Sequence, residues 1–392
     1  MIPVSDISSD HPQIFVAGGN GPYQNTASLL QKFDLSFAKG KRVLLKPNLG
    51  RSAKPDTGII TNPMIIAAAI DAFQKAGAKV AVGESPIVGV NIKEAFEESG
   101  LSLIAKKRGC RLIDLDKRGC VKMPVNNGIV LKSLQICKDV LESDIIVSIP
   151  VMKMHMHTGV TLSLKNMKGC LWKKSKVKLH MLPPVKGYDE KPINIAISDL
   201  AEILMPAFAI IDGTVGMEGL GPSAGTPKPM DVVVAGFDPF AADAVACRLM
   251  GTDAKEIPHL RLGAKRGFGI IDIDKISIFP KNWKEMASVF EPPPKNLTFE
   301  FPNINIYDKK SCSACQSTIL LLLKRDHDKI TDSFPKNKQI NIVIGKGNTD
   351  IPLDAFCIGN CASIHKKNRI FIQGCPPVGS EIFKKICNHS DI

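Results

Sequence analysis

Apolar runs and polar breaks alternate along the first 290 residues of this chain. An apolar run at 42–48 ends in Pro and Asn and predicts a buried strand. Segment 62–78 predicts a helix, because it opens with a capping Asn followed by Pro and ends near a Gly. The apolar run at 79–85 predicts the next strand. This strand–helix–strand order is typical of a parallel sheet covered by helices.

The same alternation continues up to residue 290. The run at 144–151 is rich in Val and Ile without a polar alternation, which is typical of a strand buried on both faces. We therefore predict an α/β class for residues 1–290, a large domain with a mostly parallel sheet covered by helices. Further strands are expected at 208–216 and 230–239, and further helices at 193–204, 240–251 and 260–269.

A change in composition marks a second domain. Residues 291–301 open with EPPPKN, whose three prolines predict a stiff linker. Residues 302–392 then repeat the alternation on a smaller scale and predict a small α/β module. Its strands are expected at 303–308, 339–345 and 369–374, and its helices at 316–330 and 378–387.

The small module carries cysteines at the ends of its predicted strands. Cys312 and Cys315 follow the first strand, Cys357 and Cys361 fall in the loop after the second, and Cys375 follows the third. Loops after parallel strands meet at the carboxyl edge of the sheet, so these thiols should converge. Two of the loops also open helices, whose N-termini favour the thiolate form that binds metal.

We predict a metal site of four thiolates from Cys312, Cys315, Cys361 and Cys375, with Cys357 in reserve. A CxxC pair with distant cysteines, one of them before Pro, is typical of iron–sulfur sites and favours a [4Fe–4S] cluster. Zinc is the second choice, because structural zinc commonly uses two compact knuckles and the spacing of these cysteines matches that pattern less well. A redox-active or unliganded thiol set remains a third reading. The other cysteines have no ligand-like spacing and are expected in the core.

Polar residues also gather at strand ends of the large domain. Lys153, His155, His157, Lys165 and Asn166 follow or end the buried strand near residue 150. We assign His155, His157, Lys153 and Lys165 to catalysis; the two histidines could act as acid and base near neutral pH or bind metal. The histidines could also be ordinary hydrogen-bonded loop residues. The predicted substrate-binding residues are Lys46, Asn48, Glu84, Asn166, Asp212 and Glu218.

A glycine-rich segment at 212–227 predicts a long loop that could hold a phosphate or carboxylate with backbone N–H groups. It matches neither the P-loop nor the dinucleotide fingerprint, so ATP and NAD are not indicated. Asp238 precedes a predicted helix and is expected to cap it.

Composition limits the classes of molecule that the chain is expected to bind. The formal net charge of +13 favours acidic partners, first of all an anionic small molecule, although a solvated lysine-rich surface explains it equally. Nucleic acid is not expected, because no aromatic-interleaved basic motif occurs. The sequence shows neither a signal peptide nor an apolar run long enough for a membrane span, so we expect a cytoplasmic protein without a membrane partner. A homodimer stays open.

Five motifs in order resemble the family known as domain of unknown function 362: LLKPNL, TNP with AGAKVAVGES, SIPVMKMHMHTGVTLSLKNMKG, DGTVGMEGLGP and DPFAADAVACRLMG. The resemblance covers about residues 40–270. It implies an α/β fold and an iron–sulfur module, often ferredoxin-like with CxxCxxC spacing, and no general reaction. This chain carries CSAC, GNCA and GCPP instead. Lactate racemase is distantly similar in its α/β organisation, but its histidine pattern is not reproduced, so nickel is not implied.

Together these patterns predict an iron–sulfur redox enzyme of anaerobic metabolism. It would act on an anionic small molecule bound between the two domains and take electrons from a carrier such as ferredoxin. Two alternatives stay open. One is a hydrolase, lyase or transferase with a structural zinc or cluster. The other is a binding protein that delivers metal or sulfur, or senses redox state.

Overall fold

A computed structural model of the chain describes residues 11–87, 90–293 and 300–389. The chain divides into two compact units. The first comprises Met1–Lys176 and Asn194–Pro292, and the second comprises Val177–Ile193 and Pro293–Ile392. The sequence prediction ran the large domain through 1–290 without interruption, whereas the structure assigns 177–193 to the second unit. The predicted linker 291–301 lies partly outside the described residues.

The large unit contains a ten-stranded sheet in the order β12-β1-β11-β10-β7-β2-β3-β4, with β8 pairing β10 and β9. Most pairs are parallel, and β11 is antiparallel to both of its neighbours. The fold is therefore α/β with a mixed, mostly parallel sheet, as predicted. The strands are β1 Gln13–Gly18, β2 Arg42–Pro47, β3 Lys79–Glu84, β4 Arg111–Asp114, β7 Ile145–Ile149, β8 Val151–His155, β9 Gly159–Thr161, β10 Phe208–Glu218, β11 Thr226–Gly236 and β12 Ser277–Phe279.

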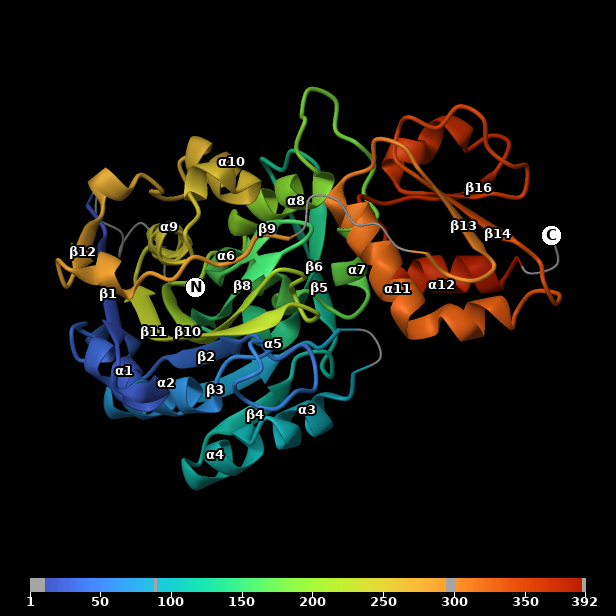
Figure 1. Cartoon of the computed structure of the whole chain (residues 1–392). Coiled ribbons are helices and arrows are strands. Elements are labelled where there is room, and N and C mark those ends of the chain that lie inside the picture. The colour runs from blue at the N-terminus through green and yellow to red at the C-terminus, as the bar shows by residue number, and fades with distance from the viewer. Residues whose placement is uncertain (1–10, 88–89, 294–299, 390–392) are drawn as a thin grey trace. The chain divides into compact units, whose positions relative to one another are not determined.

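Helices cover both faces of this sheet (Figure 1). Successive side chains of β10 point to opposite faces, so Phe208 and Ile210 enter one core while Ala209 and Ile211 enter the other. The first core is closed by α1 and α2, and the second by α9 and α10. The principal helices are α1 Gly21–Leu30, α2 Pro63–Lys75, α3 Ile92–Glu98, α4 Leu101–Lys107, α8 Pro192–Ala201, α9 Pro239–Leu249 and α10 Pro258–Lys265.

Short elements complete the large unit. The hairpin β5 Cys120–Pro124 and β6 Ser133–Cys137 forms a separate two-stranded sheet. The helical turns are η2 Ser36–Ala38, α5 Lys138–Leu141, α6 Ser163–Asn166, η3 Met167–Cys170, η4 Ala254–Glu256, η5 Ile273–Lys275 and η6 Trp283–Met286. The one-turn helix α7 Ser175–Lys178 continues into the second unit.

Local sequence explains where the helices begin. The side chain of Asn62 accepts a hydrogen bond from the N–H of Met64 at the start of α2. The Asp238 carboxylate accepts from the N–H groups of Phe240 and Ala241 at the start of α9, so the predicted capping role is confirmed. In both helices Pro follows the cap, where a missing N–H costs nothing.

The second unit is a four-stranded parallel sheet in the order β13-β14-β15-β16. The helices α11 and α12 pack on one face, and a small core around Val343, Cys357 and Ala362 lies on the other. The elements are β13 Ile304–Asp308, α11 Ser313–Thr331, β14 Ile340–Ile344, β15 Phe356–Ile358, η7 Asn360–His365, β16 Ile370–Ile372 and α12 Gly379–Cys387.

Two local predictions were wrong. Cys357 lies on strand β15 rather than in a loop, because its apolar neighbours complete the parallel sheet between β14 and β16. The glycine-rich segment 212–227 is mostly a hairpin, since β10 continues to Glu218 and β11 begins at Thr226. Only the short turn between these strands is a loop.

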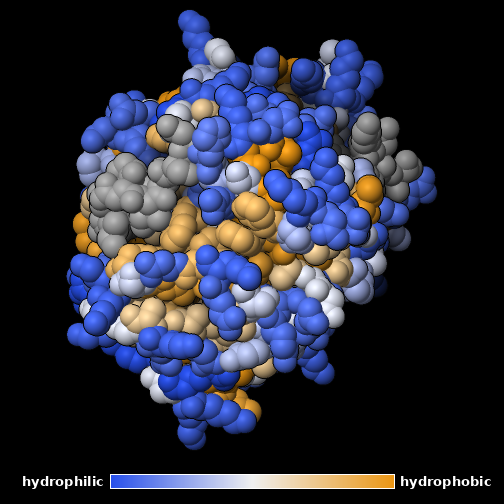
Figure 2. All heavy atoms as spheres, turned by 90° about the vertical axis from the view of Figure 1, so that its left-hand side faces the viewer, coloured by the Kyte–Doolittle hydropathy of each residue, from blue (hydrophilic) through white to orange (hydrophobic). Residues whose placement is uncertain are grey.

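Hydrophilic side chains are widely distributed on the face of the molecule that Figure 2 shows. Apolar side chains lie between them. Among the described residues, no helix is both long enough and apolar enough to cross a membrane.

Candidate functional site

A buried ion pair lies at the carboxyl edge of the large sheet. The Nζ atom of Lys46, on β2, lies 2.7 Å from Oε2 of Glu84, on β3. Both side chains are almost fully buried. Glu84 also accepts hydrogen bonds from the N–H groups of Leu49 and Ser85, and Lys46 donates to the carbonyl of Pro47. The pair is therefore held in place by the loops that follow both strands.

An asparagine pair connects this ion pair to Lys153. Asn166 donates to the carbonyl of Lys46 at 2.8 Å and to the hydroxyl of Ser148 at 3.1 Å. Its Oδ1 accepts from Asn48 at 3.3 Å, and Asn48 in turn accepts from Lys153 Nζ at 2.9 Å. Five predicted site residues therefore belong to one hydrogen-bond network, as the strand-end rule implies.

Lys153 is a buried cation with several acceptors. Besides Asn48, its Nζ donates to the carbonyls of Ile59 and Pro222. Burial lowers its pKa to about 7, with a further contribution from the charge of Arg51. The contacts make Lys153 a link between loop 48–62 and the turn that joins β10 to β11, and its charge depends on pH near neutrality.

Lys165 lies on the short helix α6, where its Nζ donates to Thr161 Oγ1 at 2.9 Å. Burial holds the pKa of Lys165 well below its ordinary value, and the charges of Lys168 and Lys153 act in the same direction. The pKa of Lys168 is likewise lowered to about 7, by burial and by Lys176. This part of the unit therefore concentrates positive charge in a poorly solvated place.

Lys176 is a site residue that the sequence analysis missed. Its Nζ donates to the carbonyl and hydroxyl of Ser85 and to the carbonyl of Leu171, and it lies 4.0 Å from Asp116. Burial lowers its pKa. It belongs to a lysine-rich stretch whose composition is typical of a solvated surface. Only its contacts with Ser85 in the folded chain distinguish Lys176 from the neighbouring lysines.

Besides Glu84, two acidic residues were predicted to bind substrate, and they lie in different surroundings. Asp212 is buried and accepts from the N–H groups of Asn62 and Thr214, and burial raises its pKa to about 6. Its charge acts on Lys153, so it belongs to the network. Glu218, at the far end of β10, pairs with Lys228 at 3.2 Å and accepts from the N–H of Glu291. Those contacts give Glu218 a structural role.

The two predicted catalytic histidines are neighbours. The rings of His155 and His157 lie 5.3 Å apart in an edge-on arrangement, and the N–H of His157 donates to Nδ1 of His155 at 3.0 Å. His155 ends β8 and is buried, whereas His157 keeps some exposed surface. The hydrogen bond fixes the ring of His155 and leaves its Nδ1 unprotonated.

In the second unit, four cysteines gather at the carboxyl edge of the sheet. The pKa of Cys315 is raised well above its usual value, first by a hydrogen bond with Cys312 and by burial, then by the charges of Cys312, Cys375 and Cys361. The thiol groups of three loops are therefore close enough for their charges to interact. A Cβ atom on Gly359, which has φ of +91°, would lie 3.4 Å from Cys315 Sγ, so the loop before Cys361 closes over that sulfur.

The four thiols differ in acidity. A hydrogen bond from Cys315 lowers the pKa of Cys312 to about 5, and Lys191 and backbone N–H groups of the helix start contribute. Burial raises the pKa of Cys375 to about 11 and also raises that of Cys361. Cys312 is therefore the thiol that is most readily a thiolate.

The reserve residue Cys357 does not belong to this group. It is fully buried on the opposite face of the sheet from α11, in the small core with Val343 and Ala362. Strand alternation explains this, because Cys357 lies between Phe356 and Ile358, which face α11 and α12.

Segment 177–193 borders the cysteine loops, which the sequence analysis did not anticipate. The carbonyl of His180 accepts from the N–H of Cys375 at 3.0 Å, and that of Leu182 accepts from Asn360 Nδ2 at 2.7 Å. Lys191, from the same segment, lowers the pKa of three of the thiols. The segment thus supplies both backbone contacts and a positive charge.

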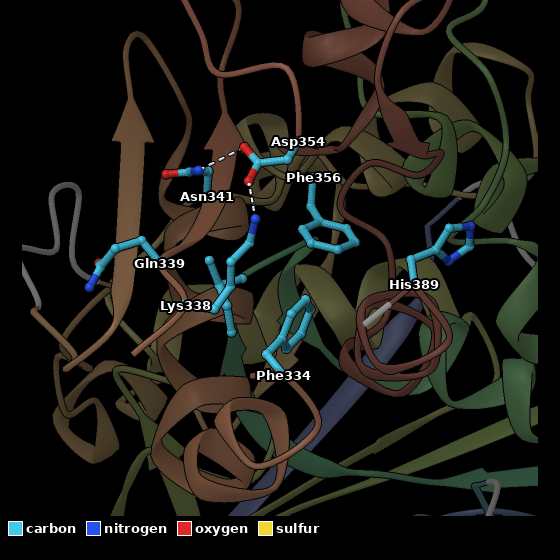
Figure 3. A pocket seen from close by; sticks show the side chains of 8 residues that line it. Phe334, Lys338, Gln339, Asn341, Asp354, Phe356 and His389 are labelled. Carbon is cyan, nitrogen blue, oxygen red and sulfur yellow. Dashed lines mark hydrogen bonds and ion pairs between the residues drawn. The ribbon is translucent and has the colours of Figure 1, made fainter. Parts of the chain in front are cut away.

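Across the described residues, no group of three or more His, Cys, Asp or Glu side chains is already arranged at metal-binding geometry. A small pocket elsewhere in this unit is lined by Phe334, Lys338, Asp354 and Phe356, with Asp354 bridging Lys338 and Asn341 (Figure 3). It lies where β14 and β15 begin, at the opposite end of the strands from the cysteines, and contains none of the predicted site residues.

The α/β fold and the motif-bearing strand ends place this chain in a family. A model described as "Domain of unknown function (DUF362)" matches residues 43–248, more than half of the chain, and the chain belongs to that family. The membership confirms the resemblance seen in the sequence.

One relative is the thylakoid-associated protein sll1697 of Synechocystis sp. It is 29% identical over 233 residues, which cover 59% of this chain and 70% of that protein. Among solved structures, the lactate racemase apoprotein of Thermoanaerobacterium thermosaccharolyticum is similar with a TM-score of 0.42 and 14% identity. That match covers 64% of this chain and 59% of the racemase.

Proposed function

We propose that the chain is an iron–sulfur protein whose large unit binds an anionic small molecule. The observation that carries the proposal is the convergence of Cys312, Cys315, Cys361 and Cys375 from three loops at one sheet edge. Four cysteine thiolates are the usual ligand set of a [4Fe–4S] cluster.

The chemistry of the donor set fits such a cluster. All four donors are sulfur, and Cys312 sits at the start of α11, where helix N–H groups favour a thiolate. Lys191 adds a positive charge that would offset part of the charge of a thiolate-bound cluster. When bound, a cluster of this kind supplies one-electron transfer, and an electron carrier such as ferredoxin is the partner that this chemistry implies.

The large unit supports the anion-binding part of the proposal. The charges of five lysines interact with one another or with shared carboxylates, and three carboxylates lie among these lysines. The cations therefore outnumber the anions in a poorly solvated place. A bound anion would offset the excess charge and raise the lysine pKa values toward their ordinary range. The lysines are Lys46, Lys153, Lys165, Lys168 and Lys176, and the carboxylates are Glu84, Asp116 and Asp212.

The test is anaerobic purification followed by iron, sulfide and zinc analysis and an absorption spectrum before and after dithionite. We expect about four irons and four sulfides per chain and a broad absorption band that bleaches on reduction. One zinc without sulfide would overturn the iron–sulfur part and favour a structural metal beside a non-redox enzyme. A thermal-shift series with small carboxylates and phosphates tests anion binding separately.

A further inference from the structure

The hairpin of the large unit carries two cysteines that the proposed function leaves without a role. Cys120 is the first residue of β5, and Cys137 is the last residue of β6. The antiparallel register of the two strands places these residues directly opposite each other. Directly opposed residues of an antiparallel pair project to the same face of the sheet, so the two side chains are neighbours. Both cysteines carry free thiols.

The backbone hydrogen bonds beside this pair define its geometry. The N–H of Lys138 donates to the carbonyl of Gly119 at 3.1 Å, one residue beyond the cysteines on both strands. Hydrogen-bonded and non-hydrogen-bonded pairs alternate along an antiparallel ladder, so Cys120 and Cys137 form a non-hydrogen-bonded pair. The Cα atoms of such a pair are about 4.5 Å apart. A disulfide needs a Cα separation of about 4.4–6.8 Å, so the backbone already meets this requirement.

The two thiols lie in different surroundings. Cys120 is partly exposed, whereas Cys137 is 0% exposed. The Sγ atom of Cys137 lies 4.0 Å from Oδ1 of Asp116, within reach of a weak S–H donor. Burial raises the pKa of Cys137, and the charges of Cys170 and Asp116 act in the same direction. A dissolved reagent therefore meets Cys120 first, and Cys137 is the thiol that waits behind it.

A third cysteine borders β6 on its other side. Leu171 forms an antiparallel bridge with Ile136, which brings Cys170 beside Cys137. Cys170 ends the helical turn η3 and is fully buried. It therefore lacks both the strand backbone and the exposed surface that Cys120 has. The register favours Cys120 as the partner of Cys137.

We infer that Cys120 and Cys137 form a reversible cross-strand disulfide by exchange with a small-molecule disulfide such as oxidised glutathione. This modification site lies apart from the four cysteines of the proposed cluster, which belong to the second unit. The inference therefore goes beyond the proposed function and does not depend on it.

The exchange is balanced in atoms and electrons. The Cys120 sulfur attacks one sulfur of the small disulfide, whose S–S bond breaks, and one small thiol leaves with the proton that Cys120 has lost. The S–H proton of Cys137 then passes to Asp116 while the Cys137 sulfur attacks the mixed disulfide at Cys120. The second small thiolate leaves and takes up that proton. Two protein thiols are oxidised, and one small disulfide is reduced to two thiols.

Asp116 connects this pair to the candidate site. Its Oδ1 accepts from the hydroxyl of Ser85 at 2.7 Å and from the N–H of Lys173 at 2.7 Å. The same Ser85 hydroxyl accepts from Lys176. Oxidation removes the S–H donor of Cys137 from this carboxylate. The disulfide therefore changes the hydrogen bonding of a residue that directly contacts the network of buried lysines.

The experiment exposes the full chain, purified anaerobically, to oxidised glutathione, blocks remaining thiols with N-ethylmaleimide and maps the peptides by mass spectrometry. We expect a linked pair of peptides that joins Cys120 to Cys137, lighter by two hydrogen atoms than the two free peptides. The link should disappear after dithiothreitol. It should be absent from Cys120→Ser and retained in Cys387→Ser, which replaces another partly exposed cysteine. Mapping of the wild-type chain keeps the test decisive if a variant folds poorly.

Three outcomes would overturn the inference. They are free thiols at both positions after the exposure, a lasting glutathione adduct on Cys120, and a link from Cys137 to Cys170 in place of the expected one. The peptides that carry the link contain none of the proposed cluster ligands. The result is therefore read independently of the iron content, and the proposed function stands or falls by its own test.

Discussion

The ammonium of Lys46 lies 2.7 Å from the carboxylate of Glu84, with side-chain exposures of 1% and 3%. Both charges are out of water, so each depends on the other. Glu84 additionally holds the N–H groups of two loops that follow β2 and β3. The pair therefore organises the sheet edge on which the other candidate residues lie.

Replacing Glu84 with Gln should be strongly destabilising, because it keeps the side-chain size but leaves a buried ammonium without its counter-charge. We expect a loss of about 3–5 kcal/mol in the free energy of unfolding. Urea denaturation measures it. Asp144→Asn is the matched control, since the pair of Arg42 and Asp144 is partly exposed and should cost about 0–1 kcal/mol. Equal losses in the two variants would contradict this account.

Asp243 should make stability fall as the pH rises. Its carboxylate accepts from the N–H groups of Ser163 and Leu164 at the start of α6, and burial raises its pKa to about 7. The folded state thus binds a proton more tightly than the unfolded state. The resulting stabilisation is complete below the unfolded pKa of about 4 and is lost as the pH rises through about 7.

The variant Asp243→Asn removes this dependence. The difference in unfolding free energy between the wild type and the variant should decrease by about 1.4 kcal/mol per pH unit within that window. Denaturant titrations at several pH values measure it. A loss of one acceptor adds a constant offset, so the slope is the quantity to compare. A difference that does not vary between pH 4 and 7 would refute the raised pKa.

Two cysteines only four residues apart should behave differently. Cys361 shares the edge with three other thiols, whereas Cys357 lies in the apolar core on the opposite face. Cys361→Ser should remove most of the iron of the proposed cluster. Cys357→Ser should keep it, with a stability loss of about 1–3 kcal/mol from burying a hydroxyl. Iron per folded chain after anaerobic purification decides the question, and iron loss in Cys357→Ser alone would reverse the assignment.

Asn360 should be required for retention of the proposed cluster. Its side chain donates to the carbonyl of Leu182 and accepts from the N–H of Gly374, so it joins segment 177–193 to the loop of Cys375. Asn360→Ala leaves both groups without their partner and should cost about 1–3 kcal/mol. The rate of iron loss to a chelator should increase. Asn368→Ala, at an exposed position, is the control, and equal rates would show that this bridge is unimportant.

Much of the architecture was predictable from local patterns. Apolar runs indicated half of the strands in the described residues, and Asn62 and Asp238 marked helix starts because capping depends on adjacent backbone groups. The rule that loops after parallel strands meet at one edge anticipated that Lys46, Glu84 and Lys153 would lie together. The same rule anticipated the gathering of the cysteines, whose role as metal ligands stays a prediction.

Other features were settled by the tertiary structure. Cys357 faces away from the other cysteines because β15 completes a sheet, and pairing with distant strands is invisible in a three-residue run. Lys176 gains importance only through burial near Ser85, 91 positions earlier in the sequence. The chain by itself determined the longer apolar strands and the capped helices, since these depend on neighbours in sequence. Packing decided which side chains lose their water, and desolvation, in turn, sets the pKa values on which the proposed chemistry depends.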